Sequence, residues 1–199
     1  MFKRLIVTIS LLLIISGCSA QSKTPEDAVN KYFKAVSTLN VVEMEQSFVE
    51  REEIEVGDVE LNDLKEMKAY YDFFKENLAL IEYEIIDSSE SEGSATVQVQ
   101  VKYVNASGVF QSVMSEALTK MFELAFKGEE VTEEMGEQLM KEAFDNAAAN
   151  FKVEFAEDVV IIPLVKVGNE WLIEEMTTEL LNVSFFGIYD LALELESLE

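Results

Sequence analysis

Few side chains in this sequence are suited to chemistry. The chain of 199 residues contains no histidine and a single cysteine, Cys18. Without histidine it lacks the commonest general base, the usual metal ligand and the residue that most often activates a serine or cysteine nucleophile. Glycine-rich phosphate loops are also missing. Carboxylates and tyrosines are the groups left for proton transfer, so we assign no catalytic residue and expect no metal and no cofactor.

Cys18 follows a segment that is typical of a secretory signal. Two basic residues precede an apolar run from 5 to 15, and two small residues separate that run from the cysteine. Eleven helical residues span about 16 Å, whereas the hydrocarbon layer of a bilayer is about 30 Å thick. We therefore expect residues 1–17 to be a cleaved signal peptide rather than a membrane-spanning helix.

The four residues Ile15-Ser16-Gly17-Cys18 resemble the lipobox of bacterial lipoproteins. The resemblance implies that the Cys18 thiol is diacylated and that Cys18 becomes the mature N-terminus. Two acyl chains are sufficient for stable anchoring, so residues 18–24 would tether the protein to the outer face of the cell membrane. The lipid would then occupy the one thiol, which leaves none for a disulfide, a nucleophile or a zinc site. An ordinary secretory signal with a chance cysteine is the alternative.

The composition is strongly acidic, with 39 acidic against 15 basic residues and a net charge of −24. Such a surface repels the phosphate backbone of nucleic acids, so we exclude nucleic-acid binding. It also repels anionic lipids, so the acyl group and not the folded part would hold the membrane. Hydrophobic residues make up 49% of the chain, which is enough for a core without cross-links. We expect residues 25–199 to form a single domain.

Helical patterns fill the first part of this domain. Thr24 can cap a helix, Pro25 suits its first position, and two acids follow in the first turn. Asn40 is expected to cap a second, short helix. The acid-rich stretch 50–60 is interpreted as a connector or short edge strand, and the apolar spacing over 61–78 predicts a third helix.

The hydrophobic period then changes to two. Alternation over 81–85 and 97–103 predicts a half-buried antiparallel pair of strands. Two further strands are expected over 152–167 and 170–176, and Gly168-Asn169 between them is a plausible hairpin turn. Pro163 removes one ladder donor and therefore predicts a bulge or an edge.

Helical spacing returns between the two pairs of strands and again at the end. Residues 109–150 carry two apolar stripes separated near Gly128, which predicts an inserted helical hairpin. The first stripe consists of Phe110, Met114, Leu118, Met121 and Phe122, and the second of Met135, Leu139, Phe144 and Ala147. A final helix is expected from about Thr178, with one apolar side made of Leu181, Phe185, Ile188, Leu191 and Leu195. The fold class is therefore α+β, with N-terminal helices on a curved antiparallel sheet, an inserted helical hairpin and a C-terminal helix.

Three pieces of the sequence resemble a known pattern. They are Thr24–Val29 with Tyr32-Phe33, the strand Ala95–Tyr103, and the Gly-x-x-Trp-x-Ile hairpin within Val165–Ile173. Together they resemble uncharacterised Gram-positive lipoproteins of the nuclear-transport-factor-2-like, or cystatin-like, fold. The resemblance implies a conical sheet that wraps a helix and often leaves a cavity, but it implies no single activity.

Two groups of residues are candidates for a ligand pocket. Tyr83, Tyr103 and Trp171 share the apolar side of the expected strands and could line a cavity. Phe110, Met114 and Met121 could cover that cavity or grip a partner, because methionine adapts to irregular apolar surfaces. The alternative for both groups is ordinary core packing.

Three functions are compatible with these observations. The first is a membrane-anchored, non-enzymatic binding module for an apolar small molecule or a protein segment. The second is a lyase or isomerase that uses a buried carboxylate with Tyr83 or Tyr103, as enzymes of this scaffold such as ketosteroid isomerase do. The third is an accessory subunit of a membrane complex, with the helical hairpin as the contact.

Overall fold

The computed structural model describes residues 23–50, 55–56, 59–60 and 68–188. Cys18, the leader and most of the tether lie outside the described residues. Leu191 and Leu195 of the expected final helix also lie outside them.

The N-terminal helices begin where the capping residues predict. Helix α1 (Pro25–Ser37) starts with a capping box, in which the Thr24 side chain accepts from the Asp27 backbone and Asp27 accepts from the Thr24 backbone. Helix α2 (Val41–Glu45) is capped by Asn40. Their buried faces contribute much of the core, and Tyr32 and Phe33 of α1 are fully buried.

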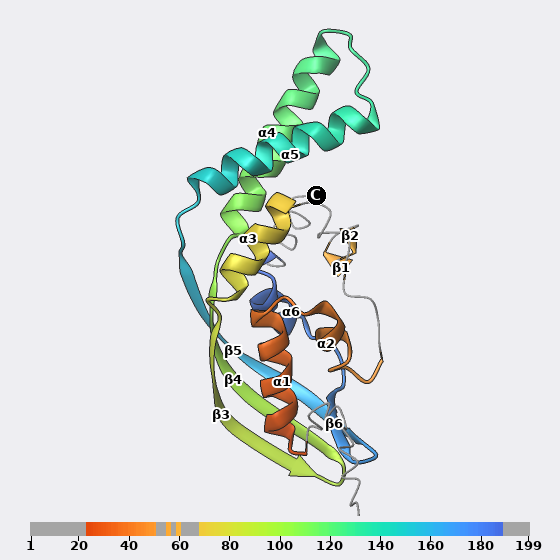
Figure 1. Ribbon diagram of the computed structural model, residues 1–199, viewed down its shortest axis with the longest axis vertical. Coiled ribbons are helices and arrows are strands. Elements are labelled where there is room, and N and C mark those ends of the chain that lie inside the picture. The colour runs from red at the N-terminus through yellow and green to blue at the C-terminus, as the bar shows by residue number, and fades with distance from the viewer. Residues whose placement is uncertain (1–22, 51–54, 57–58, 61–67, 189–199) are drawn as a thin grey trace, which may run out of the picture.

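Four antiparallel strands form the main sheet, in the order β3-β4-β5-β6. They are β3 (Glu82–Ser91), β4 (Ser94–Val104), β5 (Phe155–Val167) and β6 (Glu170–Ile173). Helices α1, α2 and α6 lie on one face of this curved sheet (Figure 1). The alternating residues of β4 and β5 on that face are buried, while Val159 and Ile161 on the other face are about half exposed. The prediction of an α+β fold with helices on an antiparallel sheet is confirmed.

Pro163 lies in the inner strand β5, where the pairing with β6 ends, and the bulge falls elsewhere. Pro163 pairs with Thr96 of β4 without a register shift, and its carbonyl accepts from Glu174 on the opposite side. The pairing between β5 and β6 starts one residue later, at Leu164. The N–H that Pro163 lacks would also face Glu174, so only one of the two backbone hydrogen bonds possible between these residues forms, at the end of the β5–β6 ladder. The irregularity in the sheet lies in β3, between Ile85 and Asp87.

The segment between α2 and the sheet contains a small hairpin and a helix. Strands β1 (Glu55–Val56) and β2 (Val59–Glu60) pair only with each other, as a separate two-stranded sheet. Helix α3 is described over Lys68–Leu78, the second half of the predicted span. Phe73 and Phe74 on its buried face contact the aromatic cluster at the base of the helical hairpin.

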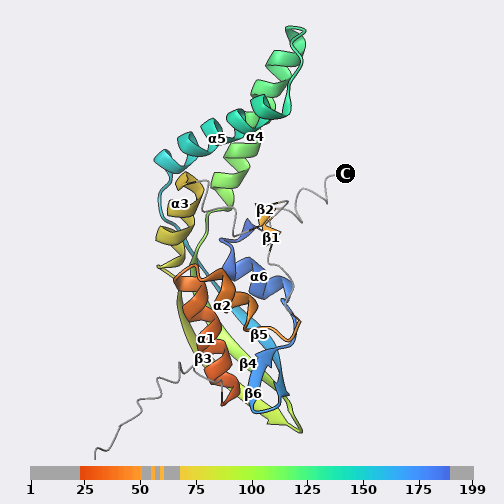
Figure 2. The same cartoon turned by 45° about the vertical axis from the view of Figure 1, so that its right-hand side comes forward.

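Helices α4 (Ser107–Phe126) and α5 (Glu133–Asn150) form the helical hairpin. In two views it extends beyond the sheet and away from α1 (Figures 1 and 2). Its base is anchored by Phe144, which is fully buried and stacks on Tyr70 of α3 with ring centroids 3.7 Å apart. Farther out, α4 and α5 pack mainly on each other.

The last helix that lies wholly within the described residues ends earlier than the sequence pattern predicts. Helix α6 spans Thr178–Ser184 and is capped by Thr177. Phe186 and Gly187 then take φ of 64° and 73°, which a right-handed helix cannot contain. The expectation of one continuous apolar side from Leu181 through Ile188 is therefore wrong. The chain turns because the Phe186 carbonyl accepts from Ala106 and Gly187 packs against Asn105, at the foot of α4.

Candidate interaction surface

The aromatic residues proposed for a sheet pocket are engaged within the body of the protein. Tyr83 is half-buried, stacks on Phe33 at 4.7 Å between ring centroids, and donates to Asn30 over 3.1 Å. Burial raises the pKa of the Tyr83 hydroxyl. Trp171 is 1% exposed, with the Lys166 ammonium 5.3 Å from its ring centroid. The packing places Tyr83 and Trp171 in contact with core or strand neighbours.

Tyr103 has a carboxylate neighbour that the sequence pattern did not reveal. Its hydroxyl donates to Asp158 Oδ2 over 2.7 Å. Asp158 pairs with Val101 across the β4–β5 ladder, so it shares the helix-covered face with Tyr103. The Asp158 side chain is exposed, whereas Tyr103 is buried. The phase of β5 was ambiguous in the sequence, because acids occupy both alternations near its start.

The three hairpin candidates fall into two different environments. Phe110 and Met121 are half-buried and pack against the core, and the Phe110 ring makes an edge contact with Phe74 at 6.2 Å. Helix α5 passes over Met121 at Gly136, where an added Cβ would lie 3.8 Å from the Met121 methyl group. Met114 is 44% exposed. The structure thus separates Met114 from the other two.

Met114 belongs to an exposed apolar row on α4. Residues four apart on a helix lie on neighbouring turns of one ridge, and this ridge, called here the distal row, consists of Met114, Leu118, Phe122 and Phe126. Their exposure rises toward the tip of the hairpin, to 62% for Phe122 and 91% for Phe126. The sequence interpretation included Leu118 and Phe122 in the helical stripe but missed Phe126.

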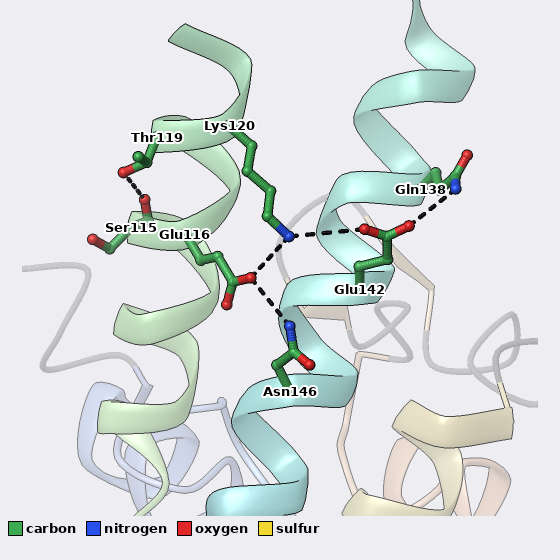
Figure 3. A network of polar contacts seen from close by, with 7 residues as sticks. All are labelled: Ser115, Glu116, Thr119, Lys120, Gln138, Glu142 and Asn146. Carbon is green, nitrogen blue, oxygen red and sulfur yellow. Dashed lines mark hydrogen bonds and ion pairs between the residues drawn. The ribbon is translucent and has the colours of Figure 1, made fainter. Parts of the chain in front are cut away.

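The charged residues of α4 lie on another side of the helix, where they tie α4 to α5. Lys120 Nζ lies 2.8 Å from Glu116 and 3.8 Å from Glu142 of α5, and Asn146 donates to Glu116 over 3.1 Å (Figure 3). The hydrogen bond with Lys120 is the main cause of a lowered pKa of Glu116, and the same bond raises the pKa of Lys120. All of these side chains are open to water, so we expect them to set helix register more than stability.

The rest of the exposed surface of α4 carries no charge. Glu116, Lys120 and Glu123 are the charged residues of this helix, and their spacing puts them on one side. The remaining exposed side chains beside the distal row are small or uncharged: Gln111, Ser112, Ser115, Thr119 and Ala125. We call this surface, together with the distal row, the uncharged face. Depletion of charge around aromatic and methionine side chains is the compositional signature of an interface core.

Two hollows in the described surface lie outside the core. One, of about 680 Å³, is an open depression along α4 between the uncharged face and the charged side, lined by residues from Gln111 to Glu123. The other, of about 180 Å³, lies over Asp87, Thr96, Gln98 and Ile161. Neither is lined by Tyr83, Tyr103 or Trp171.

Metal-binding and membrane-spanning features were sought within the described ranges. Those residues contain no cluster of three or more acidic or cysteine side chains arranged to hold a metal ion. None of the helices described there combines the length and the apolar content needed to cross a bilayer.

Comparisons with known proteins leave the family open. No family model matches the chain, and no curated protein matches it. Among solved structures, it is similar to ycdA from Bacillus subtilis, which is described provisionally as a lipoprotein. The two share 17% sequence identity with a TM-score of 0.43, over 79% of this chain and 57% of that one. The match thus spans less than two thirds of the ycdA chain.

Proposed function

We propose that this protein is a lipid-anchored, extracytoplasmic binding module that uses the helical hairpin to contact another protein. The observation that carries the proposal is the separation of two features. The lipobox-like cysteine precedes α1 by only a few residues, and the uncharged face lies at the far end of the molecule. An anchor at one end and an exposed apolar surface at the other suit a module that reaches a partner away from the bilayer.

The geometry of the tether supports this orientation. The tether runs over residues 18–24, from Cys18 to the residue before Pro25, the first residue of α1. Seven extended residues reach at most about 25 Å, so the start of α1 would stay near the lipid surface. The first turn of α1 lies at the end of the molecule opposite the hairpin tip (Figure 1). The acidic body would be repelled by anionic lipids, which favours a protein standing off the membrane.

Metabolic labelling tests the anchor. Cells expressing the full chain are fed an alkyne analogue of palmitate, and the protein is probed for the label and for sedimentation with membranes. We expect label and membrane association for the natural chain, and loss of both for Cys18→Ser. An unlabelled natural chain, or a Cys18→Ser chain that still sediments with membranes, would overturn the proposal of acylation.

Distances to the bilayer test the orientation. A spin label is placed on the hairpin loop by Glu129→Cys, or on the β3–β4 turn by Glu92→Cys, in the acylated protein held in lipid vesicles. Collisions with a lipid-bound relaxing agent should broaden the signal from position 92 more strongly than that from position 129. Equal broadening, or stronger broadening at position 129, would show that the hairpin does not point away from the membrane.

A small apolar ligand held against the sheet is a weaker version of the binding hypothesis. Tyr83 and Trp171 already have packing partners in the body, and the sheet positions Val97, Val99 and Ile162 are fully buried. A ligand there would have to displace some of these contacts. Thermal unfolding with a panel of lipids and wall fragments tests this version, and we expect no shift of the midpoint above about 1 °C.

The enzymatic alternative has one observation in its favour, which is the Tyr103–Asp158 pair. An aspartate base and a tyrosine donor are the groups that such a reaction needs. Here, however, the two groups bond to each other, and Asp158 is exposed to water. The arrangement fits a hydrogen bond that closes one end of the sheet better than a poised base, so the binding module is our conclusion.

A further inference from the structure

We propose that the uncharged face of α4 pairs with the same face of a second copy of this chain, across a two-fold axis. The inference rests on the proposed function in taking the hairpin as the contact surface, but it does not depend on acylation. It names the partner that the hairpin fits.

The distribution of charge favours the uncharged face as the place where two copies meet. The chain has a net charge of −24, so two copies repel each other over most of their surfaces. On α4, the uncharged face is the surface where two copies would bring the fewest acidic side chains together. A basic partner has no advantage on this face, because the acids of α4 lie on its other side and two of its three charged residues pair with each other. Charge therefore favours a partner with an equally uncharged surface.

The even spacing of the distal row allows it to pair with itself across a two-fold axis. Its four members are spaced evenly from Met114 to Phe126, over about 18 Å of helix. An antiparallel copy places Leu118 opposite Phe122 of the second copy and Met114 opposite Phe126, so the same row serves both sides. Ridges of residues four apart interdigitate at a crossing angle of about 50°. The neighbouring Ser115 and Thr119 are small enough to allow a close approach.

The exposed apolar area of the distal row is large enough for a weak dimer contact. Phenylalanine side chains contribute 150–250 Å² each when buried, so Phe122 and Phe126 alone offer roughly 300 Å² per copy at their observed exposure. If Met114, Leu118 and the uncharged flank are buried as well, the contact approaches the lower end of the size range of specific interfaces, about 1,000–1,200 Å² in total. We therefore expect a weak, reversible dimer of about micromolar affinity.

Co-isolation from cells tests the pairing in the full chain. Two differently tagged copies are expressed together, the membranes are solubilised in mild detergent, and one tag is captured. The natural chain should bring down the other copy, and Phe122→Asp with Phe126→Asp should lose at least about 90% of it. Val159→Asp with Ile161→Asp, on the open face of β5, is the matched control and should retain the second copy.

Sedimentation velocity gives the second measurement, on a chain that lacks residues 1–18. This chain keeps every helix and strand of the described fold, and circular dichroism melting checks that each variant is folded. A natural chain that stays monomeric at 100 μM and fails to co-isolate would overturn the proposal, as would a Phe122/Phe126 variant that pairs normally. A monomer that instead holds a different protein through the distal row would assign the surface to that protein and also overturn it. A chain that pairs but takes up no palmitate label would support the dimer and contradict the lipid anchor. A chain that is labelled but does not pair would support the anchor and contradict the dimer.

Discussion

Helix α4 carries phenylalanine at both ends, and the two ends have opposite surroundings. Near the foot of the helix, Phe110 enters an aromatic cluster with Phe74 and Phe144. At the tip, Phe126 is 91% exposed. Phenylalanine thus packs in the core at the foot of α4 and is open to solvent at its tip. An apolar stripe on a helix therefore belongs to the core only where other elements of the fold pack against it.

The largest effect should come from truncating one phenylalanine at each end of the hairpin. Phe144→Ala removes a fully buried ring from the base and should lower the free energy of unfolding by about 3–5 kcal/mol. Phe126→Ala should change it by no more than about 0.5 kcal/mol in dilute solution. Urea unfolding measures both. Equal losses would show that the tip is packed in solution as firmly as the base.

A smaller effect is expected from the buried tyrosine of the body. The Tyr32 hydroxyl lies 2.8 Å from that of Ser184, and both residues are fully buried. Tyr32→Phe leaves the Ser184 hydroxyl without this partner and should cost about 1–3 kcal/mol. Ser184→Ala is the matched control, because it removes the other hydroxyl of the same pair. It should cost less than Tyr32→Phe, since the Tyr32 hydroxyl can still donate to Met176.

The same tyrosine predicts how stability depends on alkaline pH. Burial raises the pKa of Tyr32 far above the usual value near 10, and burial also raises that of Tyr70 at the base of the hairpin. Above pH 10 the unfolded chain therefore binds fewer protons than the folded one. The free energy of unfolding should then fall as pH rises, by at most about 1.4 kcal/mol per pH unit for each such group. Tyr32→Phe should make this slope shallower, and an unchanged slope would contradict the assignment.

Amide hydrogen exchange measures how stability differs between the base and the tip of α4. Amides beyond Leu118 should exchange at least about tenfold faster than those of β4, because they depend on a hairpin that packs mainly on itself. Protection of this distal part should increase with protein concentration if the second copy covers it. Uniform protection along the hairpin, independent of concentration, would contradict both expectations.

The smallest effect is expected at the ion pairs between α4 and α5. Lys120→Met removes the contacts to Glu116 and Glu142, all of which are open to solvent. We expect a shift of the melting midpoint of no more than about 2 °C, which disappears at 1 M salt because exposed charges are then screened. A larger shift that persists at 1 M salt would show that this contact holds the hairpin together.

Several parts of the fold could be predicted from local sequence. The capping box at Thr24 and the alternation in β4 specify their elements within a few residues, because caps and strand period depend on neighbours in the chain. The candidate site was only partly predictable. The stripe from Phe110 to Phe122 identified the helix, but its periodicity is the same whether the ridge is covered or open. Asp158 could not be assigned to the face of Tyr103 from sequence, because acids occupy both faces of β5 near its start.

By itself, the sequence determined the acidic surface, the lipobox-like leader, the helices with capped starts and the sheet with its Gly168 turn, since each depends on composition or on residues close in the chain. The end of α6 depends on tertiary structure, because Ala106 and Asn105 hold the turn at Phe186 and Gly187 from far along the chain. Tertiary structure also decided which half of α4 is covered. Burial depends on which elements meet in space, and α3 and the sheet reach only the base of the hairpin.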